Sequence, residues 1–176
     1  MKSPIRFGLL SLALFVIAGC AATPPPVPGP LHVPAPASLI QQLHATGVQI
    51  YECQPAKGDP AQYEWSFKAP EAVLLTKGGK KVGKHYGGPS WEYNDGSAVV
   101  GEVVASSPSA APNSIPQLLV RAKATAGKGL FSSVQFIQRL NTVGGSVPAG
   151  GCRKEQAGQQ LRAQYSADYL FYGVKH

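Results

Sequence analysis

From Gly47 to the C-terminus, the sequence is a series of short segments rich in valine, isoleucine and aromatic residues, separated by glycine, proline and Asn-Asp-Gly. This pattern is typical of β-strands joined by turns. We expect about nine strands: Val48–Cys53, Tyr63–Lys68, Ala72–Thr76, Lys81–Tyr86, Ser90–Tyr93, Ala98–Ala105, Gln117–Ala124, Ser133–Asn141 and Gln164–Val174. So many short strands with few helical windows predict one all-β domain over residues 38–176, built as an antiparallel sandwich or barrel.

The last segment has the clearest strand pattern. Its residues divide between two faces, with Tyr165, Ala167, Tyr169 and Phe171 on one and Ser166, Asp168, Leu170 and Tyr172 on the other. The sequence Asn94-Asp95-Gly96, between two predicted strands, indicates a hairpin. The stretch Ser38–Ala45 is ambiguous, because its leucine and isoleucine residues also have helical spacing. We interpret it as a strand that runs into Val48.

Residues 1–19 have the features of a secretory signal peptide. Lys2 and Arg6 precede an apolar run of 12 residues, from Phe7 to Ala18. This run is too short to cross a bilayer, which takes roughly 20 residues. Cys20 follows a small pair, Ala18-Gly19, and this order resembles the lipobox of bacterial lipoproteins, in which the cysteine is acylated and becomes the first residue of the mature chain.

The lipobox resemblance implies that the lipid on Cys20 holds the protein at a membrane. Stable anchoring takes at least two acyl chains, and a lipoprotein cysteine carries up to three. An aspartate directly after the cysteine is the usual inner-membrane retention signal in enterobacteria, but Ala21 and Ala22 stand here. We therefore expect a lipid-anchored protein of the bacterial cell envelope, at the outer membrane and facing the periplasm.

Seven of the sixteen prolines lie between residues 24 and 36. Proline restricts φ and lacks an N–H donor, so this stretch favours polyproline II. At about 3.1 Å per residue it would hold the domain roughly 40 Å from the membrane. We interpret residues 20–37 as the lipidated cysteine and a proline-rich tether.

Cys53 and Cys152 are the two cysteines that remain after Cys20. In an oxidising compartment we expect them to form a disulfide. A metal pair is the alternative, but no histidine is close to either cysteine, and no HxH, HExxH or CxxC spacing is present. We therefore expect no metal and no cofactor.

The formal net charge is +7, and removal of the signal peptide lowers it by two. A moderate positive charge can favour an anionic envelope surface, and simple solubility is the alternative. The one basic cluster consists of Lys77, Lys80, Lys81 and Lys84. No basic stretch is interleaved with aromatic residues, so we expect no nucleic-acid partner.

The segment from His85 to Glu92 is the best candidate for a site. Its glycines and proline predict a tight turn that brings His85, Trp91 and Glu92 near one another. A histidine beside a carboxylate can act as an acid or a base. The alternative is a structural corner, with a hydrogen-bonded histidine, a core tryptophan and a surface glutamate.

Two charged residues, Arg139 and Asp168, lie within otherwise apolar strand patterns. A buried ion pair between them is one interpretation, and orientation of a polar ligand is the other. Several aromatic side chains either line a ligand cavity in a barrel or form its core: Tyr51, Trp65, Trp91, Tyr169 and Tyr172.

The chain from about residue 43 to residue 173 resembles the domain-of-unknown-function family 3455 of secreted bacterial and fungal proteins. The blocks that carry the resemblance include His44–Cys53, Trp65, Phe67, Pro70–Ala72, Gly83–Glu92, Asp95–Ser97, Ile115-Pro116, Arg121-Ala122, Gln138-Arg139, Cys152 and Tyr165–Tyr169. Gln117 departs from the pattern, because the family usually has tryptophan there. The resemblance implies a fold and a secreted location, and no activity.

These observations favour an envelope lipoprotein with a non-catalytic binding or structural β-domain. The alternative is a secreted hydrolase that uses His85 and Glu92, and the surroundings of His85 distinguish the two.

Overall fold

A computed structural model of the chain describes residues 26–174, and the predicted signal peptide and Cys20 lie outside this range. The described residues form eight strands and three short 3-10 helices: η1 (Gly29–Leu31), β1 (Ser38–Ala56), β2 (Asp59–Leu75), β3 (Lys81–Tyr86), β4 (Ser90–Tyr93), β5 (Ala98–Ser107), β6 (Gln117–Ala126), η2 (Leu130–Ser133), β7 (Val134–Gly144), η3 (Lys154–Gln156) and β8 (Gln160–Gly173).

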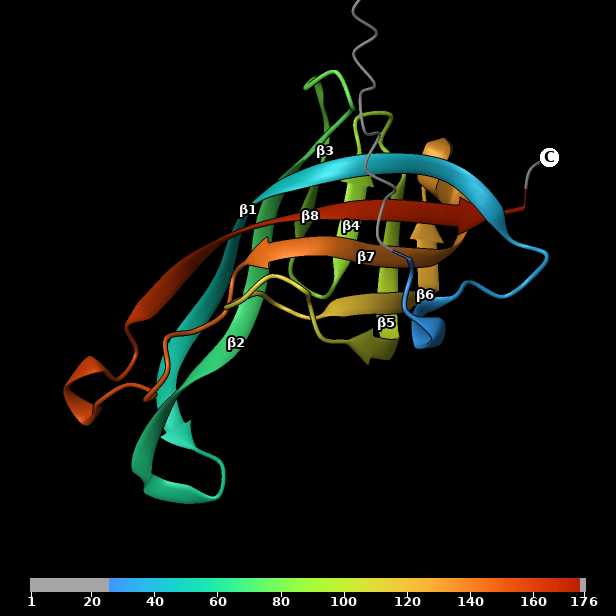
Figure 1. Ribbon diagram of the computed structural model, residues 1–176. Helices are drawn as coiled ribbons and strands as arrows, with labels where there is room; N and C mark the ends of the chain where they lie inside the picture. Colours follow the sequence, from blue (N-terminus) through green and yellow to red (C-terminus); the bar gives the residue numbers. More distant parts are fainter. Residues whose placement is uncertain (1–25, 175–176) are drawn as a thin grey trace, which may run out of the picture.

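The strands form one closed antiparallel barrel. Each strand pairs with the next along the chain, and β8 closes the sheet by pairing with β1. In Figure 1, β1, β8 and β7 cross in front of β3 to β6, and the β1–β2 hairpin extends well beyond the barrel wall. The all-β prediction is confirmed, and of the two expected architectures the structure is the barrel.

The described residues form eight strands where about nine were expected, because two of the expected segments are continuous. Tyr63–Lys68 and Ala72–Thr76 belong to one long strand, β2, which continues through a bulge opposite Ile50 and Tyr51. Pro70 is tolerated within β2 because pairing with β3 begins only at Ala72, which leaves this part of the strand with β1 as its only neighbour. The stretch from Ser38 to Ala45 is strand, as expected, and opens β1.

The barrel interior holds the main hydrophobic core. The predicted inner face of β8 is confirmed, since Tyr165, Ala167, Tyr169 and Phe171 are all buried. Gly101 makes room for other large side chains of this core. A Cβ atom at this position would overlap a methyl group of Val120 and lie 3.4 Å from the indole of Trp91.

Helix η2 closes one end of the barrel. Phe131 from this helix is fully buried and packs against Phe171, with 4.3 Å between the ring centroids. The predicted hairpin at Asn94-Asp95-Gly96 supports η2, because the Asp95 carboxylate accepts hydrogen bonds from the backbone N–H groups of Ser97 and Leu130, both at 2.8 Å. The opposite end of the barrel has no such plug among the described residues.

The proline-rich segment is not an extended spacer over its described part. Residues 26–37 lie against the outside of the barrel, where the fully buried Leu31 joins Leu119 and Leu140 in a second apolar cluster. The Gln138 side chain donates a hydrogen bond to the Leu31 carbonyl oxygen at 2.6 Å. Val27 and Val33 also pack there, because apolar residues alternate with the prolines and cover apolar side chains on the outer wall.

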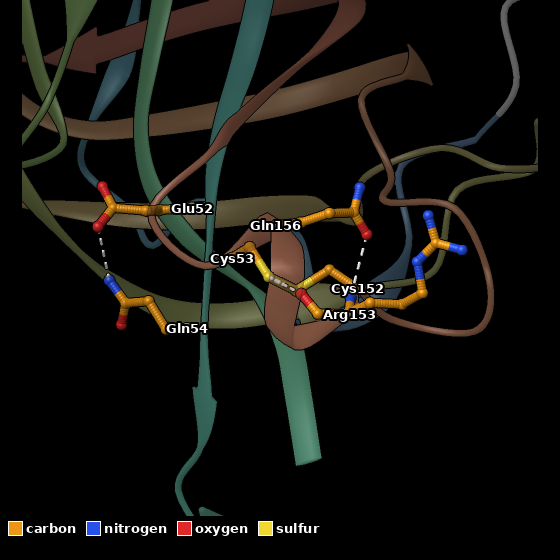
Figure 2. The surroundings of a disulfide bond; sticks show 6 residues. All are labelled: Glu52, Cys53, Gln54, Cys152, Arg153 and Gln156. Carbon is orange, nitrogen blue, oxygen red and sulfur yellow. Dashed lines mark hydrogen bonds between the residues drawn. A yellow bond between two sulfur atoms is a disulfide. The ribbon is translucent and has the colours of Figure 1, made fainter. Parts of the chain in front are cut away.

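The predicted disulfide between Cys53 and Cys152 is present, with 6.0 Å between the two Cα atoms. It joins the extended β1–β2 hairpin to the connection between β7 and β8 (Figure 2). All eight strands, this disulfide and both apolar clusters lie within residues 26–174.

Candidate functional site

A cavity of about 390 Å³ lies at the end of the barrel opposite η2. Its lining residues come from strands β1, β2, β3, β5, β6 and β7 and from two connections: Gln49, Tyr51, Phe67, Pro70, His85, Gly88, Pro89, Val103, Ile115, Pro116, Leu118 and Arg139. Most of the lining is apolar, and three polar side chains, Gln49, His85 and Arg139, interrupt it.

The rim of the cavity presents exposed apolar side chains. Phe67 is 57% exposed and Val103 is 53% exposed, which is unusual for such side chains. Tyr51 contacts Phe67 edge to face and donates a hydrogen bond to the Gly145 carbonyl oxygen at 2.7 Å. This bond holds Tyr51 in place, so the rim is a fixed apolar surface around the entrance.

His85 lies on the inner wall, on β3, directly opposite Trp91 on β4. The two rings stack with 4.4 Å between centroids, and Nδ1 of His85 is 2.8 Å from the Ser90 carbonyl oxygen. Burial, with a smaller contribution from the positive charge of Arg139, lowers the pKa of His85 to about 3, although the hydrogen bond to Ser90 acts in the opposite direction. The imidazole is therefore neutral at pH 7, and we assign the proton to Nδ1, which donates to Ser90.

Four buried polar side-chain atoms lack a hydrogen-bond partner within the described chain. Gln49 Nε2 belongs to the cavity lining, and Trp91 Nε1, Tyr165 Oη and Tyr169 Oη belong to core residues behind it. The Tyr165 hydroxyl is near Tyr169 and Gln49 without reaching hydrogen-bond geometry with either. Each unpartnered polar group lowers stability by about 1–3 kcal/mol. Such a group in a folded protein needs an explanation, and a polar ligand or bound water supplies one.

Arg139 reaches into the barrel from β7, where it pairs with Leu118 on β6 and Tyr169 on β8. Its Nε and Nη2 atoms both donate to the Pro116 carbonyl oxygen, at 3.0 and 2.8 Å. The predicted ion pair with Asp168 does not form. Asp168 lies on the outer face, where its carboxylate accepts hydrogen bonds from His44 Nδ1 and Asn141 Nδ2, both at 2.9 Å.

The structure does not bring His85 and Glu92 together. The tight turn is present, but Glu92 is opposite Lys84 on the outer face, with 3.1 Å between the charged groups, while His85 faces inward. Trp91 is next to His85, as expected. Neighbouring residues of one strand point to opposite faces, so Trp91 and Glu92 could not both face His85.

Among the aromatic candidates, Tyr51 lines the cavity, while Trp91 and Tyr169 form the core behind it. Tyr172 lies on the outer face and donates to the Gln138 side chain, and Trp65 is opposite Cys53 on the hairpin extension. No local sequence pattern indicated Gln49, Val103 or Pro116. They lie far apart in the chain, and only the closed barrel brings them to one cavity.

Residues 26–174 also hold one hydrogen-bonded histidine–carboxylate pair, His44 with Asp168, on the outer face of the barrel. No set of three or more histidine, cysteine, aspartate or glutamate side chains in this range is placed to hold a metal ion. No helix of this part is both long and apolar enough to cross a membrane. The lysine cluster lies on and beside the β2–β3 turn, and Lys84 is the member that forms an ion pair, with Glu92.

The fold and the cavity define an all-β protein with an eight-stranded antiparallel barrel that is open at one end. The chain belongs to the family described as Protein of unknown function (DUF3455), whose model matches residues 34–173. This match confirms the resemblance of the sequence and extends it to the proline-rich segment. No curated protein and no solved structure matches the chain.

Proposed function

We propose that this protein is a non-catalytic binding module of the bacterial envelope that takes up a small amphipathic molecule in the barrel cavity. The unpartnered Nε2 atom of Gln49 in the lining, with the unpartnered hydroxyl of Tyr165 near it, carries this proposal, because most of the lining around Gln49 is apolar. A volume of about 390 Å³ falls within the range of about 300–1,000 Å³ that is usual for small-molecule sites. The apolar rim and polar inner end suit a ligand with one apolar and one polar end.

Binding is a better account of the cavity than catalysis. No carboxylate is among the lining residues, and His85 is neutral and already donates its Nδ1 proton to the backbone. Glu92, the partner expected in a hydrolase, is on the other side of the wall. General acid–base catalysis needs a proton donor or acceptor with a pKa near the working pH, and the pKa of His85 is near 3.

Binding is tested with a neutral fluorescent probe, N-phenyl-1-naphthylamine, which brightens in apolar surroundings. We expect saturable binding at one site per molecule to residues 20–176 carrying Cys20→Ser. Val103→Trp should weaken this binding at least tenfold, because a large side chain at the rim fills the entrance. Fluorescence titration of both proteins measures the difference.

Val104→Trp is the matched control. Val104 is the next residue of β5, is 45% exposed and does not line the cavity, so this variant should bind the probe as well as the parent protein. Absence of saturable binding, or equal binding by the Val103→Trp and parent proteins, contradicts the proposed function.

The envelope location rests on Cys20. We expect the N-terminal peptide of the mature protein to begin at Cys20 and to carry acyl chains, and the protein to sediment with membranes. The control protein consists of residues 20–176 with Cys20→Ser and is exported by the cleavable signal peptide of a soluble periplasmic protein. Without acyl chains, this control should be found in the soluble fraction. Mass spectrometry and fractionation measure both. An unmodified Cys20, or membrane attachment of the Cys20→Ser form after a high-salt wash, contradicts the anchor.

A further inference from the structure

Arg139 brings a positive charge to the cavity without a matching negative one. No carboxylate of the described residues lies within 4.0 Å of its guanidinium group, whereas Arg121 and Arg162, on the outer face, each pair with a glutamate. A charge that is partly removed from water is unfavourable unless it is paired. The usual solution, an internal ion pair, is absent here.

The guanidinium group also has free donors in a useful arrangement. Of the five N–H donors of an arginine, two point from Nε and Nη2 to the same Pro116 carbonyl oxygen. These bonds fix the orientation of the group and occupy one of its edges. The edge formed by Nη1 and Nη2 makes no hydrogen bond within the described residues, although the Tyr169 hydroxyl lies close to the guanidinium group. This edge matches the two oxygens of a carboxylate.

Arg139 supplies the only formal charge among the lining residues at neutral pH. His85 is neutral, because burial lowers its pKa to about 3. Burial raises the pKa values of Tyr51 and, behind the lining, of Tyr165 and Tyr169, so these phenols keep their protons. Tyr51 already donates its proton to Gly145, whereas the hydroxyl groups of Tyr165 and Tyr169 have no partner within the described residues. The positive charge of Arg139 opposes this rise at all three tyrosines.

We infer that the ligand is an amphipathic carboxylate, with its carboxylate on the free edge of Arg139 and its apolar body along Tyr51, Phe67, Val103 and Leu118. This inference rests on the proposed function and adds the ligand class. A carboxylate offsets the single unpaired charge, and the unpartnered hydroxyl of Tyr169 lies close to the guanidinium group that would hold it. A single positive charge does not offset both charges of a phosphate monoester, which leaves one of them desolvated.

The test uses compounds that share one apolar body: phenylbutyrate, phenylbutanol, phenylbutylamine and phenylbutyl phosphate. The affinity of each compound is measured at neutral pH by its displacement of N-phenyl-1-naphthylamine from the protein of residues 20–176 carrying Cys20→Ser. We expect phenylbutyrate to bind about tenfold more tightly than the alcohol, the difference typical of a charge-assisted hydrogen bond. The phosphate and the amine should bind more weakly than phenylbutyrate.

Arg139→Gln should lower the affinity for phenylbutyrate to about that for phenylbutanol and so remove the preference for the carboxylate. The control is Arg121→Gln, which makes the same change in net charge on the outer face and should keep the preference. Thermal unfolding by circular dichroism, together with binding of the neutral probe, verifies that both variants are folded.

The inference is overturned if phenylbutyrate and phenylbutanol bind equally to the parent protein, if the phosphate binds best, or if the carboxylate preference survives in the Arg139→Gln protein. In each of these cases the neutral probe still binds, so the proposed function stands. A parent protein that binds neither the probe nor any of the four compounds contradicts the proposed function itself.

Discussion

Replacement of both Cys53 and Cys152 by serine is expected to lower the free energy of unfolding by about 2–5 kcal/mol and to leave the barrel folded. The disulfide closes a loop with a sequence separation of 99 residues. In the chain-entropy model such a loop stabilises the folded state by about 4.7 kcal/mol, because the cross-link restricts the unfolded chain. Urea unfolding at pH 7.5, with and without a reductant, measures the loss.

The barrel should survive this change because backbone hydrogen bonds already hold the same region. The N–H of Cys53 donates to the Gln159 carbonyl oxygen at 3.0 Å, and the N–H of Gly158 donates to the Cys53 carbonyl oxygen at 2.9 Å. The hairpin extension and the β7–β8 connection therefore stay together without the sulfur–sulfur bond. Unchanged stability of the double serine variant, or two free thiols in the unreduced parent protein, would count against this account.

The second large effect is a dependence of stability on pH that originates at His85. Near pH 7.5 the ring is neutral in both the folded and the unfolded state. Below pH 6.5 the unfolded chain takes up a proton at this residue, but the folded protein resists it until about pH 3. The free energy of unfolding therefore falls as the pH falls through this window, by about 1.4 kcal/mol per unit for one proton.

The comparison that isolates this effect is His85→Phe, which keeps an aromatic ring against Trp91. Between pH 7.5 and pH 4.5 the parent protein should lose about 2–3 kcal/mol more stability than the variant. Carboxylates that titrate in the same range are present in both proteins, so their contributions cancel in the difference. Denaturant unfolding at the two pH values measures it. Equal losses in the two proteins would show that His85 takes up its proton normally in the folded state.

The two ends of the chain show which parts of the fold could be predicted from the sequence. The alternation from Tyr165 to Tyr172 identified the inner face of β8, because a strand with one face in the core must place its apolar residues two apart. At the other end, the prolines between residues 24 and 36 indicated a spacer. They did not reveal that Leu31 is buried against the outer wall, since that contact depends on strands more than eighty residues away.

The candidate site was predicted only in part. Trp91 does stack on His85, but Glu92 lies on the opposite face of the sheet. Strand alternation alone could have predicted this, because Trp91 and Glu92 are neighbours in one strand. Arg139 and Asp168 were identified by the same reasoning, as charges within apolar strands. One lies inside the barrel and the other outside, and their expected partnership is replaced by bonds to Pro116 and to His44.

Residue patterns were enough to predict the all-β class, the hairpin at Asn94–Gly96, the pairing of Cys53 with Cys152 and the membership of the family. Each follows from local residue patterns, from the number of cysteines or from matching blocks. Closure of the sheet into a barrel with a cavity at one end became visible in the three-dimensional structure. Closure depends on pairing between β1 and β8, and on strand curvature, which no local pattern encodes. For the same reason, only the structure placed the unpaired charge of Arg139 beside the buried phenols of Tyr165 and Tyr169.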